Sequence, residues 1–152
     1  MTMIKVTDEP INAAEALKAF ESGVAGAGAI VSFTGLVRDQ ASSGDVETLH
    51  LQAYSPMTET GIATAREEAH ERWPLIDSHI IHRIGDMLPG DAIVFVATAS
   101  AHRRPAFEAA DYLMDYLKTE AVFWKKETTL SGTKWIEPRA EDYKDRARWS
   151  GS

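Results

Sequence analysis

A nearly uninterrupted apolar stretch, Ala92–Ala99, constrains the fold of this chain more than any other segment. It reads AIVFVATA, and an apolar run of this length and β-branched content predicts a strand at the centre of a sheet. A chain of 152 residues is long enough to bury one sizeable core around such a strand, but it is shorter than most chains with two domains. We therefore predict a single domain over residues 1–152.

Segments that favour strands and helices alternate along the rest of the chain. Strands are predicted at residues 3–7, 29–37, 46–54, 76–84, 122–130 and 133–137, and helices near Pro10, Pro56 and Pro105. Two hairpins are implied, one of them at Ser131–Gly132, so the strict βαβ rhythm of a doubly wound sheet is missing. The pattern predicts an α+β fold with about three helices. Residues 138–152, polar apart from Trp149, are predicted to form a flexible C-terminal tail.

The amino-acid composition excludes several kinds of chemistry. The chain has no cysteine, so it has no disulfide, no thiolate zinc site, no cysteine-bound iron–sulfur cluster and no thiol nucleophile. Its net charge of −7 argues against general nucleic-acid binding, which needs a basic face. Residues 1–100 carry 6 basic and 14 acidic side chains, whereas residues 101–152 carry 10 basic and 9 acidic ones. An anion site is therefore expected in or near the last third.

The sequence shows no signal for export or membrane insertion. Residues 1–10 include acidic side chains without the apolar core of a signal peptide, and no stretch approaches the roughly 18 apolar residues of a membrane span. We expect a cytoplasmic protein that binds neither membranes nor nucleic acid.

The densest polar cluster, Ser100–Arg104, lies between the predicted central strand and the helix near Pro105. Backbone N–H groups and the dipole at a helix N-terminus favour an anion, and His102 and Arg103 would add side-chain donors. Alternatively, His102 caps the helix or packs, and the arginines form a solvated patch. The residues alone leave both interpretations open.

Three lysines form a second cluster. Lys118 lies near the end of the same helix, where the dipole alone favours a cation, and Lys125 and Lys126 lie on the strand that follows. Because neighbouring side chains on a strand point to opposite faces, Lys125 and Lys126 cannot both face one pocket. We expect one of them to face solvent.

Other cations follow the ends of strands. Arg38 opens a polar loop, and Arg139 follows the last strand. Two like charges about 4 Å apart repel by about 4 kcal/mol at an effective dielectric constant near 20, so convergence of these cations would require an anion. No metal or cofactor is expected: His79 and His82, three residues apart on a predicted strand, point to opposite faces.

Several motifs resemble the catalytic (large) subunit family of molybdopterin synthase. They are FTGLVR at residues 33–38, IHRIG at 81–85, PGD at 89–91, SAHR at 100–103, AFEA at 106–109, DYLK at 115–118 and FWKKE at 123–127. The match spans about residues 28–139 in order and spacing. It departs at Val122, where the family commonly has proline, and at Arg104–Pro105, where small polar residues are frequent.

The resemblance implies an α/β-hammerhead type of fold with a mixed or antiparallel sheet. It also implies a homodimer that binds a small ubiquitin-like sulfur-carrier subunit at each end, which makes a heterotetramer. The implied enzyme is a sulfurtransferase of molybdenum cofactor biosynthesis. It converts cyclic pyranopterin monophosphate to molybdopterin by inserting two dithiolene sulfurs, each delivered as a thiocarboxylate on the carrier's C-terminal Gly-Gly.

The resemblance also assigns roles to individual residues. Lys118 and Lys125 would be catalytic and would flank the carrier's C-terminus and the reacting carbons. An unperturbed lysine is only about one part in two thousand neutral at pH 7, so a role as base needs a lowered pKa; electrostatic stabilisation is the other role, and both stay open. The residues expected to bind substrate are Leu36, Val37, Arg38, His102, Arg103, Lys126, Glu127 and Arg139.

Two other functions stay open from the sequence. A chain that keeps the fold and docks the carrier without turnover would be a non-catalytic anion-binding or adaptor module. A hydrolase of phosphorylated metabolites is the other possibility. Turnover of the cyclic pterin separates the enzyme from the adaptor, and copurification with a small Gly-Gly-ended partner separates the synthase from the hydrolase.

Overall fold

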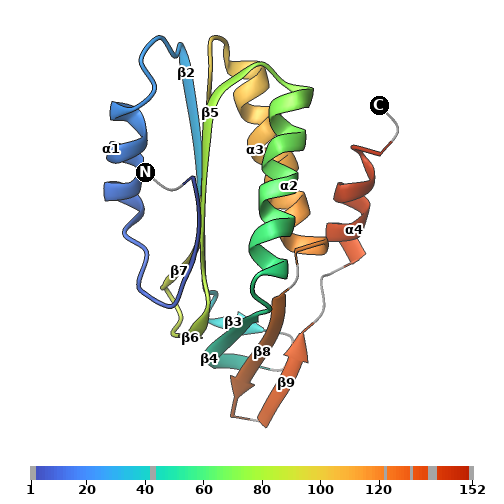
Figure 1. Cartoon of the computed structure of the whole chain (residues 1–152). Helices are drawn as coiled ribbons and strands as arrows, with labels where there is room; N and C mark the ends of the chain where they lie inside the picture. Colours follow the sequence, from blue (N-terminus) through green and yellow to red (C-terminus); the bar gives the residue numbers. More distant parts are fainter. Residues whose placement is uncertain (1–2, 42–43, 122, 131, 137–139, 151–152) are drawn as a thin grey trace.

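The computed structural model describes residues 3–41, 44–121, 123–130, 132–136 and 140–150, and these form two sheets (Figure 1). The central sheet has the order β1 (Ile4–Thr7), β5 (Leu75–Arg83), β7 (Ala92–Ser100), β2 (Ala29–Leu36). Only β1 and β5 pair in parallel, so the central sheet is mixed. The end sheet, at one end of the central sheet, has the order β3 (Gln40–Ala41), β4 (Gly44–Ala53), β8 (Phe123–Thr129), β9 (Gly132–Ile136), and β6 (Gly85–Met87) pairs with β4.

Helices cover both faces of the central sheet. One face packs against α1 (Ala13–Ser22), and the other packs against α2 (Met57–Arg72) and α3 (Arg103–Thr119) (Figure 1). A further helix, α4 (Ala140–Ala147), lies outside α3. The α+β class with a mixed sheet is confirmed, and the described residues form four helices where the sequence predicts about three. Among these described helices, none has the length and apolar character needed to cross a membrane.

The strand β7 is the centre of the core, as its apolar sequence predicts. It pairs with β5 on one side and β2 on the other, and every residue from Val94 to Ser100 is buried. Phe95 packs in the cluster that contains Phe20 of α1, whereas Val96 packs in the cluster that contains Leu113 of α3. Both faces of β7 are therefore covered by helices, which explains why the strand has no polar alternation.

Phe123, the first residue of β8, joins the two sheets. It packs against the cluster between α2, α3 and the central sheet, and also against the end-sheet cluster of Val37, Leu49, Leu51 and Met87. Because α3 ends at Thr119 and β8 begins at Phe123, the chain passes directly from the helix into the end sheet.

The two histidines of β5 point to opposite faces, as their spacing predicts. His79 contacts Phe95 edge-on with the ring centroids 6.2 Å apart, and burial lowers its pKa. His82 stacks on Phe123 with the centroids 4.1 Å apart and the planes 25° apart. Burial lowers the pKa of His82 to about 4. The hydrogen bond to the Arg83 carbonyl raises this pKa, whereas the positive charges of Lys118 and Lys125 lower it further.

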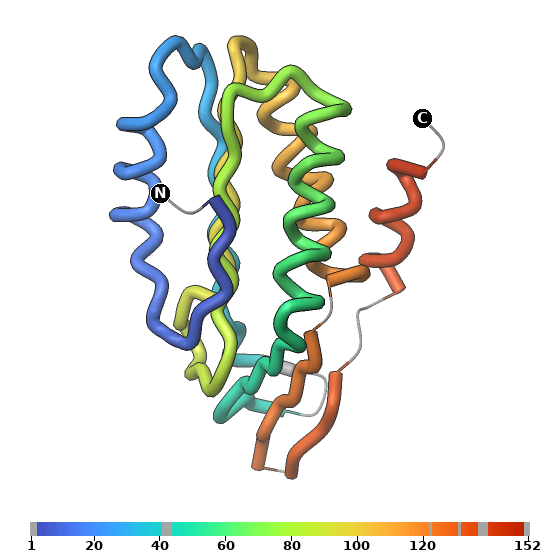
Figure 2. The backbone as a smooth tube through the Cα atoms, in the orientation of Figure 1, coloured from blue at the N-terminus to red at the C-terminus, as the bar shows by residue number. Residues whose placement is uncertain are grey.

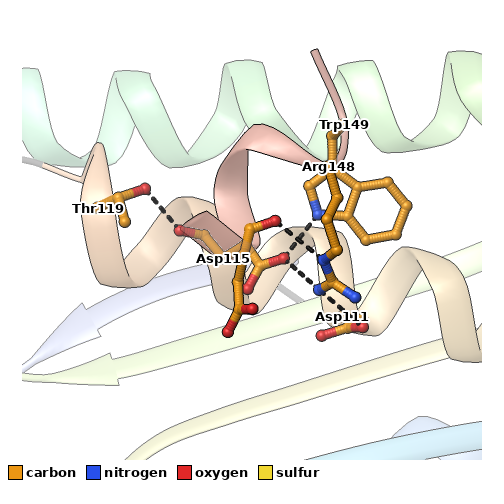
Figure 3. A network of polar contacts seen from close by, with 6 residues as sticks. Asp111, Asp115, Thr119, Arg148 and Trp149 are labelled. Carbon is orange, nitrogen blue, oxygen red and sulfur yellow. Dashed lines mark hydrogen bonds and ion pairs between the residues drawn. The ribbon is translucent and has the colours of Figure 1, made fainter. Parts of the chain in front are cut away.

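A polar and aromatic contact attaches α4 to α3. The carboxylate of Asp115, buried in α3, accepts hydrogen bonds from Nη2 of Arg148 at 2.8 Å and Nε1 of Trp149 at 2.6 Å (Figure 3). The Trp149 ring also packs edge-on against Trp73 and Tyr112. Residues 140–147 are thus helical within the segment for which the sequence predicts a flexible tail. Trp149, the one tryptophan of that segment, packs against Tyr112 of α3 and against Trp73, the C-cap residue of α2.

Replacing Trp149 with Ala removes these ring contacts and one hydrogen bond to Asp115. Truncation of a packed aromatic side chain is expected to lower the free energy of unfolding by about 2 kcal/mol, measured by urea denaturation. Tyr143→Ala is the matched control, because Tyr143 lies on α4 and is 54% exposed. Equal urea midpoints for Trp149→Ala and the unmodified chain would contradict the packing described for α4.

The buried, neutral His82 predicts a loss of stability at low pH. The unfolded chain takes up a proton near pH 6.5, whereas the folded chain resists it until about pH 4, so stability falls as the pH drops through this window. The full loss from this group is about 3 kcal/mol. Urea unfolding of His82→Phe at pH 7 and pH 4.5 should show a smaller decrease than the unmodified chain. An identical decrease in both proteins would contradict the prediction.

Candidate functional site

Lys118, Lys125 and His82 form a group at the junction of α3 and the end sheet, which we name the lysine cluster. Lys118 is exposed in the last turn of α3. Lys125 pairs with the buried Leu51 across β4 and β8, so it points to the same face of the end sheet as Phe123, two residues earlier. His82 stacks on Phe123, and both lysine charges act on its ring. The fold therefore brings the two predicted catalytic lysines to one place.

Lys126 lies on the opposite face of β8, as strand geometry predicts. It pairs with His50 of β4 and Trp135 of β9, and its Nζ lies 5.1 Å from the centroid of the Trp135 ring. Glu127 shares the Lys125 face and pairs with Lys134 of β9. Among the predicted substrate-binding residues, Glu127 is thus on the lysine-cluster face and Lys126 is not.

A second group of predicted residues lines an open pocket at the start of α3, which we name the helix-start pocket. Its lining is Gly28, Ala101, His102, Arg103 and Arg104. His102 is the N-cap residue of α3 and is exposed, and its side chain makes no capping hydrogen bond within the described part of the chain. The side chain of His102 is therefore available to a ligand, along with two exposed guanidinium groups.

Close backbone packing shapes this pocket. The Gly28 N–H donates to the Ser100 carbonyl at 3.0 Å, and a Cβ added at Gly28 would lie 2.1 Å from the Ala101 carbonyl oxygen. Only glycine fits so close to this turn. The buried Ser100 hydroxyl donates to the His102 carbonyl oxygen, which holds the turn before α3.

The helix-start pocket and the lysine cluster lie at opposite ends of α3. Lys118 follows Arg103 by 15 residues within one continuous helix. With a rise of 1.5 Å per residue, their backbones are about 22 Å apart. Figure 2 shows α3 running along the central sheet toward the end sheet. One chain therefore does not bring His102 and Arg103 to Lys118 and Lys125.

Three of the remaining predicted residues, Leu36, Val37 and Arg38, lie at the end of β2 or directly after it. Val37 is buried in the end-sheet cluster; its N–H donates to the Asp91 carbonyl at 2.9 Å, and its carbonyl accepts from the Gly90 N–H at 2.8 Å. Leu36 and Arg38, on either side, are exposed. The strand β2 ends at Leu36, and Arg38 follows two residues later. Figure 1 shows the end sheet at one end of the central sheet to which β2 belongs. Arg139 lies outside the described residues, so its predicted role stays a prediction.

Sequence reasoning missed two features of these sites. One is the close approach of Gly28 to the turn before α3, and the other is the stacking of His82 on Phe123. The spacing of Phe123 and Lys125 shows that they share a face of a strand. No local pattern shows that a histidine of a different sheet stacks against that face.

Known proteins resemble this chain over nearly its whole length. A family model described as MoaE protein matches residues 6–120. The molybdopterin synthase catalytic subunit of Caulobacter vibrioides is 48% identical over 147 residues, which cover 97% of each chain.

Solved structures share the fold. The molybdopterin biosynthesis MoaE protein from Burkholderia ambifaria superposes with a TM-score of 0.83 at 39% identity and covers 100% of both chains. The molybdopterin synthase from Staphylococcus aureus superposes with a TM-score of 0.80 at 33% identity and covers 90% of this chain and 98% of that one. This chain therefore belongs to the MoaE family of molybdopterin synthase catalytic subunits, and the expected resemblance is confirmed.

Proposed function

We propose that this chain transfers sulfur from a thiocarboxylated carrier subunit to cyclic pyranopterin monophosphate and so forms the dithiolene of molybdopterin. The observation that carries the proposal is the lysine cluster, in which two cations from different elements lie around a buried, neutral His82. The chain has no cysteine, so it has no thiol of its own to donate sulfur. The sulfur must therefore come from a partner, and the cations serve to receive it.

The charges of the proposed reactants fit this cluster. A cyclic phosphate and a thiocarboxylate are both anions, and each charge-assisted hydrogen bond to an ammonium contributes roughly 1.5–3 kcal/mol. In each transfer the sulfur forms a bond to a carbon of the pterin side chain while a carbon–oxygen bond at that carbon breaks. One oxygen leaves with the phosphate as its ring opens, and the other leaves as water. Water then cleaves the bond between sulfur and the carrier's acyl carbon and leaves a carboxylate on the carrier. Lys118 and Lys125 would stabilise the negative charge in both steps.

The length of α3 leads to a further part of the proposal: the complete site is shared by two copies of the chain. His102 and Arg103 of a second copy would bind the phosphate beside Lys118 and Lys125 of the first, because about 22 Å separates these groups in one chain. The planar guanidinium of Arg103 suits a phosphate.

An uncovered edge supports the homodimer. β2 is an edge strand of the central sheet, and Phe33 and Leu36 on it are 43% and 57% exposed. Phe107 on α3, which packs beside β2, is 57% exposed. An exposed strand edge flanked by large apolar side chains is typical of a surface that a partner covers. The proposed assembly adds one carrier to each protomer, and its proposed location is the cytoplasm.

Lys118→Ala and Lys125→Ala test the catalytic assignment. Each should lower the rate of dithiolene formation by at least about 100-fold, because an electrostatic contact to the developing charge is lost. The assay combines the purified chain with thiocarboxylated carrier and the cyclic pterin. Lys144→Ala, an exposed lysine on α4, should retain the full rate. A near-normal rate in either lysine-cluster variant removes that residue from the mechanism.

Mixed dimers test the shared site. Lys125→Ala and Arg103→Ala chains should each be inactive alone. When they are co-expressed with different tags, half of the dimers should be mixed, and each mixed dimer should contain one intact site, so about a quarter of the activity should return. If each site lay within one chain, every site would carry a substitution, and the mixture would stay inactive.

A further inference from the structure

His82 lies at the base of the lysine cluster in a fixed orientation. The residue is 6% exposed, and its imidazole ring stacks on Phe123. Nδ1 lies 3.0 Å from the carbonyl oxygen of Arg83. A carbonyl oxygen accepts hydrogen bonds and cannot donate them, so Nδ1 carries the proton in this contact.

This arrangement leaves the other ring nitrogen unprotonated. Burial, reinforced by the charges of Lys118 and Lys125, lowers the pKa of His82 to about 4, so the ring is neutral at pH 7. A neutral ring with its proton on Nδ1 presents a lone pair at Nε2. The guanidinium of the neighbouring Arg83 is directed elsewhere, toward the Asp91 carboxylate at 3.3 Å and the Asp86 carbonyl at 3.4 Å. The two lysines are the cations that act on the ring.

We propose that His82 is a positioning residue for sulfur transfer: Nε2 accepts a hydrogen bond from the Lys118–Lys125 pair and directs the ammonium groups toward the anionic reactants. This inference rests on the proposed function of the two lysines. A carboxylate at this position would pair with a lysine and cancel its charge, whereas a neutral imidazole orients an ammonium without cancelling it. The two neighbouring cations also disfavour a metal ion at this nitrogen.

Three substitutions separate the two ring nitrogens. His82→Phe keeps the stacking on Phe123 without polar atoms, and His82→Asn keeps a donor for the Arg83 carbonyl without an acceptor at the Nε2 position. Both should lower kcat about 100-fold with little change in KM, because the ammonium groups lose their orientation. His82→Gln places its amide oxygen near the position of Nε2 and should recover at least about tenfold of this loss.

The matched control is His79→Phe. His79 lies on the same strand, points to the opposite face and is also 6% exposed. This variant should keep kcat within about twofold of the unmodified enzyme, since it touches none of the proposed machinery. Full activity of His82→Phe, or equal loss in His82→Gln and His82→Phe, overturns the proposal. A purely structural role would instead make activity follow the unfolding free energies of the variants.

Nitrogen-15 NMR of the histidine-labelled chain tests the contact without turnover. At pH 7 the His82 ring should show a protonated Nδ1 and an unprotonated Nε2. The Nε2 resonance should move in Lys118→Ala or Lys125→Ala and stay in place in Lys126→Ala, on the opposite face of β8. A proton on Nε2, or no movement in either variant, overturns the proposal. This result decides the role of His82 in the cluster even if the chain forms no dithiolene.

Discussion

Burial of β7 on both faces is the constraint on which the rest of this structure depends. Because helices must cover both sides of the strand, α1 packs against one face, and α2 and α3 pack against the other. α3 begins three residues after β7 ends and lies back along the sheet. The helix therefore carries a polar group at each of its ends, with the helix-start pocket at one and Lys118 at the other.

The separation of the helix-start pocket from Lys118 determines where the molecule can bind two anions. Each end of α3 gathers cations, and each group by itself suits one anionic reactant. In the proposed mechanism, the helix-start pocket of a second copy of the chain lies beside the lysine cluster of the first, because α3 keeps the two groups of one chain apart. The proposed shared site also gives a role to the positive groups of an otherwise acidic protein. The formal net charge is −7, yet arginine and lysine side chains gather where the anions are proposed to bind.

Much of the fold follows from local sequence patterns, because those patterns report burial directly. The apolar run of β7 predicts a central strand, and the alternation of Lys125 and Lys126 predicts their opposite faces. Local patterns fail where a contact joins distant segments. The segment that contains α4 is held to the rest of the chain by the contacts of Trp149 with Trp73 and Tyr112. The sequence pattern of residues 138–152 does not predict these partners.

The candidate site, like the fold, is predicted only in part by the sequence. Motif resemblance selects Lys118, Lys125, His102 and Arg103, but it does not show that α3 holds the two pairs apart. That distance is a property of an uninterrupted helix, which becomes certain only when its start at Arg103 and its end at Thr119 are known. The stacking of His82 on Phe123 joins two sheets and requires the complete tertiary structure.

The central claim is that this chain, which has no thiol, forms a dithiolene with sulfur from a carrier. The most direct measurement incubates the purified chain with cyclic pyranopterin monophosphate and a carrier whose thiocarboxylate contains sulfur-34, and then determines the mass of the pterin product. We predict molybdopterin with two heavy sulfurs, and two carriers converted to the carboxylate for each product. A pterin without heavy sulfur, or formation of the same product at the same rate without this chain, would contradict the claim.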